Sequence, residues 1–266
     1  MNPVEIHQGD SPIVLGLPHT GTFVPDVILA DLNPRGRGLD DTDWHIHTLY
    51  EGVLAGATSV RATFHRYVVD ANRDPSGVSL YPGQNTTGLV PITDFDGLDI
   101  WSTPPTETDI ESRRQIFHEP YHASLAAELA RVRDLHGIAI LYDCHSIRSG
   151  IPFLFDGTLP DFNIGTNLGT TCASQLEAAT KEICGAANGF SSITNGRFKG
   201  GWTTRHYGRP DEGLHAIQME LAQNTYLTDE AAPWVYDPGK SARLRVHLKS
   251  ILTKLAELAP TLKGTK

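Results

Sequence analysis

The sequence predicts an α/β protein in which helices cover a mainly parallel or mixed β-sheet. Short apolar runs typical of strands alternate along the chain with longer segments of helical periodicity, which is the order of elements in such folds. Most of these runs are apolar at successive positions rather than at every second one. Both faces of the sheet are therefore expected to be buried.

Six segments are predicted to be strands. The first, residues 11–17, ends where Pro18 and His19 begin a polar turn. The others are residues 58–62, 66–69, 138–142, 151–155 and 214–220. Polar motifs stand directly against several of these runs, and open α/β sheets build their functional sites at the ends of strands.

Four segments have the periodicity of helices. Residues 107–136 place apolar side chains three or four positions apart, so one helical face should pack on the sheet. Pro120 is expected to kink or divide this helix because proline lacks the amide hydrogen that the helix needs. Gly137 is expected to end it. Similar patterns span residues 46–54, 172–187 and 238–258.

Length, charge and cysteine content limit the classes of function. The chain has 266 residues and no linker-like segment, so a single domain spanning residues 1–266 is expected. Its formal net charge of −9 argues against a nucleic acid or an anionic membrane as partner and favours a small-molecule substrate. The three cysteines lack Cys-x-x-Cys spacing, so neither a disulfide framework nor a thiolate zinc site is expected.

Location follows from two further features. No apolar run approaches the length needed to span a bilayer, and the first residues lack the pattern of a secretory signal. A cytoplasmic protein is therefore expected.

Two histidines follow predicted strands. His19 stands after residues 11–17, and His145 stands after residues 138–142, with Asp143 two positions before it. Either histidine could be satisfied by hydrogen bonds in a loop, but two imidazoles at the ends of buried strands favour a metal site. Asp143 could then orient the imidazole of His145.

The segment around Asp43 leaves two interpretations open. His45 and His47 belong to a pattern of helical spacing, where residues two apart point to nearly opposite sides, so they are not expected to bind one ion together. Asp43 stands at the start of this helix. Its carboxylate could cap the helix or bind a metal, and composition alone does not decide between the two.

A metal-dependent reaction is favoured over a protein nucleophile. Cys144 and His145 are neighbours on a strand and should point to opposite faces, and no Gly-x-Ser-x-Gly turn surrounds Ser146. Glu220 would be costly to bury without a partner or a catalytic role. An ion pair with an arginine would satisfy it, but beside two strand-end histidines the preferred interpretation is a general base.

Arginines and glycines are concentrated in residues 195–209. Glycines allow a closely packed loop, and guanidinium groups bind carboxylates through paired hydrogen bonds. Arg73 and Arg148 are candidates to join this group, although each arginine could instead neutralise a nearby aspartate.

Several long motifs together resemble the N-formylglutamate deformylase (N-formylglutamate amidohydrolase) family. They are residues 18–22, 41–45, 66–73, 79–89, 143–149, 195–201 and 204–210, in this order along the chain. The resemblance implies a three-layer α/β/α fold similar to zinc carboxypeptidases, formed by a single amidohydrolase domain. It also implies hydrolysis of N-formyl-L-glutamate to formate and L-glutamate in histidine degradation.

The same resemblance assigns roles to individual residues. The metal ligands would be His19, Asp43 and His145, and the cofactor would be one divalent metal, with Zn²⁺ favoured and Co²⁺, Mn²⁺ or Fe²⁺ as alternatives. Glu220 would be the base for a metal-activated water, and Arg148 would help to stabilise the oxyanion. The residues expected to bind the substrate and its two carboxylates are Asn72, Arg73, Arg205, His206 and Arg209.

Two rival functions remain open at this point. An amidohydrolase of the same fold could act on another N-acyl amino acid or on a C-terminal peptide bond, because fold and ligands do not fix the substrate. A non-catalytic protein could bind an acidic amino acid with the same arginines, although it would have no use for Glu220 beside two strand-end histidines.

Overall fold

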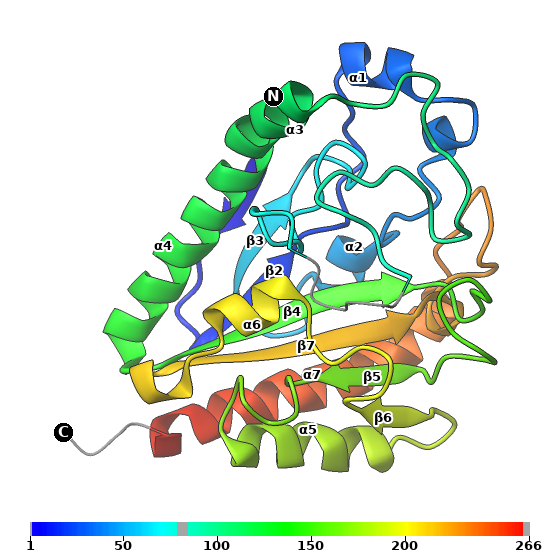
Figure 1. The fold of residues 1–266 in the computed structure, drawn as a ribbon. Coiled ribbons are helices and arrows are strands. Elements are labelled where there is room, and N and C mark those ends of the chain that lie inside the picture. The colour runs from blue at the N-terminus through cyan, green and yellow to red at the C-terminus, as the bar shows by residue number, and fades with distance from the viewer. Residues whose placement is uncertain (1, 79–84, 263–266) are drawn as a thin grey trace.

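A mixed β-sheet lies at the centre of the molecule (Figure 1). The structure is a computed structural model that describes residues 2–78 and 85–262, so residues 79–84 of the motif 79–89 lie outside the described residues. From one edge to the other, the strands are β1 (Val4–His7), β3 (Thr58–Ala62), β2 (Ile13–Leu17), β4 (Ala139–Ile147), β7 (Leu214–Ala222), β5 (Phe162–Gly165) and β6 (Ser192–Thr194).

The central strands β3, β2, β4 and β7 run parallel to one another. At the edges, β1 is antiparallel to β3, β5 is antiparallel to β7, and β6 is parallel to β5. The predicted mainly parallel or mixed sheet is confirmed, and the parallel centre places the carboxyl ends of β2, β4 and β7 at the same edge.

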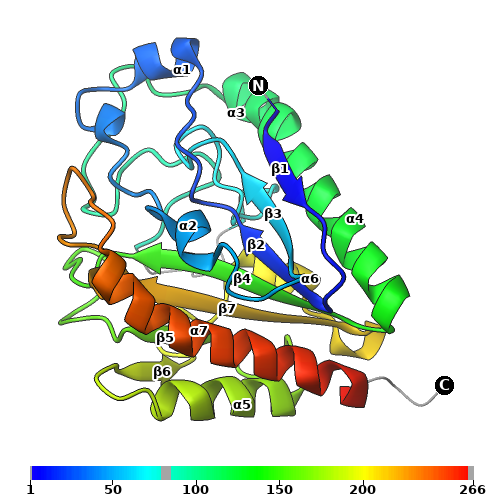
Figure 2. The same cartoon turned by 180° about the vertical axis from the view of Figure 1, so that it is seen from behind.

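Helices form a layer on each face of the sheet (Figure 1, Figure 2). On one face lie α4 (Glu119–His136), which is preceded by α3 (Glu107–Arg113), and α6 (Trp202–Tyr207). On the other face lie α2 (Ile46–Tyr50), α5 (Ser174–Gly185) and α7 (Pro238–Leu258). The short helix α1 (Asp26–Asp31) stands beyond the sheet. The architecture is thus three-layer α/β/α, as expected. No helix within residues 2–78 and 85–262 is long and apolar enough to cross a membrane.

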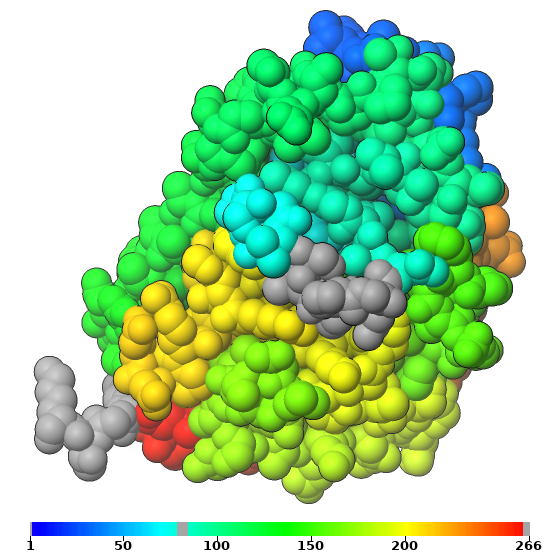
Figure 3. Space-filling view, in the orientation of Figure 1, coloured from blue at the N-terminus to red at the C-terminus, as the bar shows by residue number. Residues whose placement is uncertain are grey.

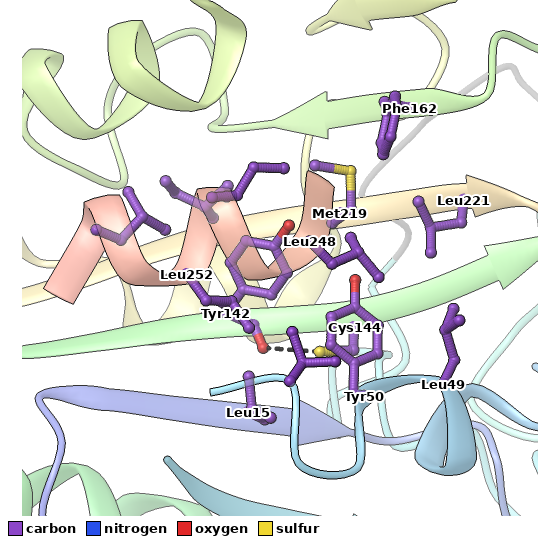
Figure 4. Close-up of a cluster of buried hydrophobic side chains, with 14 of the residues drawn as sticks. Leu15, Leu49, Tyr50, Tyr142, Cys144, Phe162, Met219, Leu221, Leu248 and Leu252 are labelled. Carbon is purple, nitrogen blue, oxygen red and sulfur yellow. Dashed lines mark hydrogen bonds between the residues drawn. The ribbon is translucent and has the colours of Figure 1, made fainter. Parts of the chain in front are cut away.

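The packing between the sheet and α7 shows why the strands are apolar at successive positions. Leu15, Tyr142 and Met219 project from three neighbouring strands toward Leu248 and Leu252 of α7 (Figure 4). All nine residues of β4 and all nine of β7 are buried. A second apolar cluster fills the opposite face beneath α4, so the sheet is covered on both sides.

Cys144 belongs to this core rather than to the functional site. Its thiol lies 3.4 Å from the carbonyl oxygen of Tyr142, and burial holds its pKa well above the ordinary value. The sequence-based preference for a buried thiol over a Cys-His nucleophile agrees with this placement.

The helix predicted for residues 107–136 is divided close to Pro120, as expected. Residues Arg114–His118 form a π-helical turn between α3 and α4, and Pro120 stands in the first turn of α4, where its missing amide hydrogen is tolerated. Gly137 ends α4 with a φ of 78°, and its amide donates to the carbonyl oxygen of Arg133 at 2.7 Å. Helix α7 has the predicted bounds, and α5 lies within residues 172–187.

Two strand predictions are wrong. Residues 66–69 form a turn in which the amide of Val68 donates to the carbonyl oxygen of His65 at 2.9 Å. Residues 151–155 also turn, with the amides of Leu154 and Phe155 both donating to the carbonyl oxygen of Ile151. Both are short apolar runs, whose periodicity does not distinguish a strand from a buried turn. The strands β1, β5 and β6 were not predicted, because segments of three or four residues with polar members carry too little pattern.

Candidate metal centre and its cavity

Three predicted metal ligands meet at the carboxyl ends of β2 and β4. His19, Asp43 and His145 are all buried, and one ligand atom of each lies within 4.8 Å of the other two. The Oδ2 atom of Asp43 is 3.2 Å from Nδ1 of His145 and 3.8 Å from Nδ1 of His19. The structure therefore brings together side chains that are far apart in the sequence.

The turn after β2 carries His19 to this position. Gly21 allows the turn because a β-carbon there would lie 2.4 Å from the backbone of Thr63. The carbonyl oxygen of His19 then accepts a hydrogen bond from the amide of Asp43 at 3.1 Å. This bond fixes the segment that carries Asp43 beside the end of β2.

The side chain of Asp43 does not cap a helix. Its Oδ1 accepts a hydrogen bond from Arg66 at 2.8 Å, and its Oδ2 accepts one from the amide of Ser146 at 3.2 Å. The residue preceding α2 is His45, which makes no capping bond through its side chain. Of the two interpretations of Asp43, helix capping is wrong.

Each imidazole has a carboxylate on its second nitrogen. Asp70 Oδ1 is 2.6 Å from Nε2 of His19, and Asp143 Oδ1 is 3.1 Å from Nε2 of His145. Such carboxylates orient a ligating histidine and leave its other nitrogen directed at the metal. The sequence predicted this contact for Asp143 but not for Asp70. The available signal was a buried aspartate directly after the apolar run 66–69.

Burial and neighbouring charges shift the pKa values of all three candidate ligands. Burial, followed by the charge of Arg66, lowers the pKa of His19 to about 4, so its imidazole is neutral at pH 7. Burial alone would raise the pKa of Asp43, but Arg66 and then His145 outweigh it and hold that pKa below the ordinary value. Burial would lower the pKa of His145, but Asp143 and then Asp43 raise it well above the ordinary value.

These residues suit a divalent cation. His19 Nδ1 is buried without a hydrogen-bond partner among the described residues, and an unsatisfied buried polar atom costs about 1–3 kcal/mol. Two imidazoles and one carboxylate are a typical ligand set of catalytic zinc.

Glu220 lies on β7, the strand next to β4, beside the candidate ligand His145. In the register of β4 and β7 it pairs with His145, and its Oε2 accepts a hydrogen bond from Nε2 of Gln218 at 3.0 Å. Burial is the largest cause that raises the pKa of Glu220 to about 7. The oxygen of the Gln218 amide accepts from the backbone amide of Gly201 at 2.6 Å, which fixes the direction in which its NH₂ group points.

A cavity opens beside this centre. The described residues lining it combine the candidate centre, polar donors and an apolar wall: His19, Arg66, Asn72, Arg73, Asn85, Thr86, Thr87, Phe95, His145, Ser146, Ile147, Leu154, Arg197, Phe198, Gly201, Gln218 and Glu220. Figure 3 shows the face where residues 70–78, 85–101, the 150s and the segment of α6 come together.

The predicted substrate-binding residues divide into two groups. Asn72 and Arg73 line the cavity, and Nδ2 of Asn72 is 3.2 Å from Nε2 of His145. Arg205, His206 and Arg209 are not among the described residues that line it. Arg205 donates to the carbonyl oxygen of Gly200, His206 stacks on Trp202, and Arg209 pairs with Glu212 at the surface. Arg148, which was predicted to be catalytic, pairs with Asp96.

Two cavity arginines were not singled out from the sequence. Arg66 lies in a run that was taken for a strand, and Arg197 stands in the Arg/Gly-rich segment from which Arg205 and Arg209 were chosen. Both arginines lie in motifs that carry the family resemblance, but the sequence does not show which arginines face the cavity.

His45 and His47 serve other contacts. The Nε2 atom of His45 is 2.8 Å from the carbonyl oxygen of Trp234, and Nδ1 of His47 is 2.6 Å from the hydroxyl of Thr20. The two imidazoles therefore do not share a partner.

The fold and the buried group define the class: an α/β/α protein with a candidate metal centre at the carboxyl ends of its central strands. Comparison with known proteins identifies the family within this class. Residues 11–227 match the N-formylglutamate amidohydrolase family, and the chain belongs to this family. The resemblance found from the motifs is confirmed.

Individual relatives agree with the family. The chain is 44% identical to an N-formylglutamate deformylase of Pseudomonas aeruginosa, over 93% of this chain and 94% of the relative. It is 42% identical to an N-formylglutamate deformylase of Pseudomonas putida, over 95% of both. The crystal structure of N-formylglutamate amidohydrolase from Ralstonia eutropha JMP134 superposes with a TM-score of 0.81 at 25% identity, over 98% of this chain and 99% of that one.

Proposed function

We propose that this chain hydrolyses N-formyl-L-glutamate to formate and L-glutamate, as a step of histidine degradation. The observation that carries the proposal is the placement of Glu220 and the candidate ligands His19 and His145 on one cavity that also presents Arg73 and Asn72. The third candidate ligand, Asp43, lies beside both imidazoles. Membership of the family and the names of its relatives support the substrate.

We infer that His19, Asp43 and His145 hold one divalent metal ion, with zinc preferred for this ligand set. When bound, such an ion polarises a carbonyl oxygen and lowers the pKa of water to about 7. Asp70 and Asp143 keep the two imidazoles oriented through their Nε2 atoms. Arg66 holds the carboxylate of Asp43 in place.

Glu220 is the proposed general base. Its carboxylate accepts a proton from the attacking water as the water oxygen bonds to the formyl carbon, and it returns a proton to the amide nitrogen as the C–N bond breaks. Gln218 positions this carboxylate, because its NH₂ group donates to Oε2 while its oxygen is held by Gly201. One carboxyl group can serve both transfers because burial raises its pKa toward physiological pH.

Arg66 is the proposed partner of the developing oxyanion. It lines the cavity, its Nε has no hydrogen-bond partner among the described residues, and its guanidinium lies 4.9 Å from the ring centre of Phe95. A fixed cation at this place stabilises the negative charge on the formyl oxygen. Arg148, which the sequence suggested for this role, is held by Asp96 instead.

The remaining proposals concern the protein as a whole. One sheet spans the described residues, which supports a single amidohydrolase domain over residues 1–266. The net charge of −9 supports a small-molecule substrate rather than nucleic acid or an anionic membrane. We also infer a cytoplasmic location.

Formate release from N-formyl-L-glutamate by the purified protein tests the proposal. Activity should disappear with a chelator and return when zinc or cobalt is added. Parallel assays with N-acetyl-L-glutamate and a glutamate-terminated dipeptide test the rival amidohydrolase functions. Release of acetate or of the free amino acid without release of formate would reject the proposed substrate.

A further inference from the structure

The cavity holds arginines at two different places. Arg73 belongs to the surroundings of the candidate metal centre, because its NH1 lies 3.7 Å from Oδ2 of Asp70, the aspartate that contacts His19. Its Nε and NH2 donate to the carbonyl oxygen and hydroxyl of Thr87, both at 2.9 Å. The guanidinium is thus fixed beside the reacting end of the cavity.

Arg197 approaches the cavity from another direction. It follows β6, and its Nε donates to the carbonyl oxygen of Leu154 at 3.0 Å, while its NH2 donates to that of Asn85 at 3.2 Å. Its guanidinium also lies 5.5 Å from the ring centre of Phe198. Leu154, Asn85 and Phe198 belong to segments other than those that carry the candidate ligands, so Arg197 enters the cavity from a different part of its wall than Arg73 does.

The substrate has the same two-ended form. Its α-carboxylate is attached to the carbon that bears the reacting amide nitrogen, so it must lie close to Glu220 and the candidate ligands. Its side-chain carboxylate stands at the end of a flexible methylene chain and must lie further out. The apolar wall of Phe95, Ile147, Leu154 and Phe198 suits the methylene groups between them.

We propose that Arg197 binds the side-chain carboxylate and thereby selects N-formyl derivatives of acidic amino acids, while Arg73 binds the α-carboxylate that all amino acids share. This inference rests on the proposed hydrolysis of N-formyl amino acids and adds the residue that reads the side chain. A guanidinium whose orientation is fixed by two carbonyl groups is prepared to meet a carboxylate with little loss of side-chain entropy.

The two roles predict different responses to a change of substrate. N-formyl-L-glutamine has nearly the shape of N-formyl-L-glutamate but carries an amide in place of the side-chain carboxylate. Replacing a residue that binds this carboxylate should change the ratio of kcat/KM for the two compounds. Replacing a residue that binds the α-carboxylate should lower both kcat/KM values together and leave their ratio unchanged.

The experiment measures kcat/KM for both compounds with the wild type, Arg197→Met and Arg73→Met. We expect Arg197→Met to lower the preference for N-formyl-L-glutamate by about 10- to 100-fold, the effect of losing a charged hydrogen bond, mainly through KM. We expect Arg73→Met to weaken both substrates to a similar extent. Arg133→Met, a change on the surface of α4, is the matched control and should alter neither value.

Three results would overturn the inference: an equal loss on both compounds in Arg197→Met, no loss in that variant, or a changed ratio in Arg73→Met instead. If Arg197→Met does not fold, Arg197→Lys keeps the charge without the paired donors and should lower the ratio partially. Calorimetric binding of the same two compounds gives an independent readout. It would reveal the role of Arg197 even if wild-type protein releases no formate, which would reject the proposed function alone.

Discussion

Replacement of Glu220 by glutamine separates its proposed proton transfer from its structural contacts. Glutamine keeps the shape of the side chain and can present an oxygen to Nε2 of Gln218, which donates to Glu220 at 3.0 Å. The fold should therefore persist. The amide cannot accept a proton from water, so kcat should fall by about 10²- to 10⁴-fold, the usual contribution of a general base.

The raised pKa of Glu220 adds a dependence on pH. Burial raises it from the ordinary 4.5 to about 7, so the carboxylate is protonated, and the base lost, as the pH falls through that value. Below it, wild-type kcat/KM should fall about tenfold per pH unit. A divalent cation bound nearby would favour the carboxylate and would move this acid limb to lower pH.

The assay is formate release between about pH 5 and pH 9 by metal-loaded wild type and Glu220→Gln. Metal content and thermal unfolding of both proteins serve as controls. The acid limb should vanish from the residual activity of the variant. Activity above about one tenth of the wild type, or an unchanged acid limb in the variant, would refute the assignment of Glu220 as the base.

Three further predictions concern the surroundings of the centre and the core. Asp70→Asn should weaken metal binding by about 10- to 100-fold, because the carboxylate that orients His19 is lost. Competition with a coloured chelator measures the metal affinity, and an unchanged affinity would contradict this prediction. Gln218→Met should lower kcat more than it raises KM. In a protein that already carries Glu220→Gln, it should add little further loss of activity. Additive losses would show that Gln218 does not act through Glu220. Leu252→Ala should destabilise the fold by about 2–5 kcal/mol in denaturant unfolding, since this side chain is fully buried. Val246→Ala on the exposed side of α7 should change the stability by less than about 0.5 kcal/mol, and similar losses in both variants would argue against the packing described here.

Local signals were sufficient for much of the framework. The fold class, the division of the long helix near Pro120 and its end at Gly137 each depend on a few neighbouring residues, through backbone geometry and periodic burial. The runs 66–69 and 151–155 were mistaken for strands because a short apolar run is compatible with either a strand or a buried turn. Pairing with a neighbouring strand decides between these, and it is not a local property.

In the candidate metal centre, too, local signals predicted some residues, while contacts between distant parts of the chain decided others. The sequence pointed to His19, His145 and Glu220 by their positions at strand ends, and motif resemblance favoured Asp43 as the third ligand. It left open whether Asp43 caps a helix, and it did not indicate Asp70, whose role depends on a contact across 51 positions of the chain.

What the sequence by itself determined is therefore the kind of fold, the family and the residue types at the strand ends. Only the tertiary structure decided which arginines face the cavity, that Asp70 contacts His19, and that His145 and Glu220 are paired on β4 and β7. The physical reason is that periodicity and backbone preference act over a few residues. Distances between remote side chains follow from strand order, register and loop packing, which the whole chain sets together.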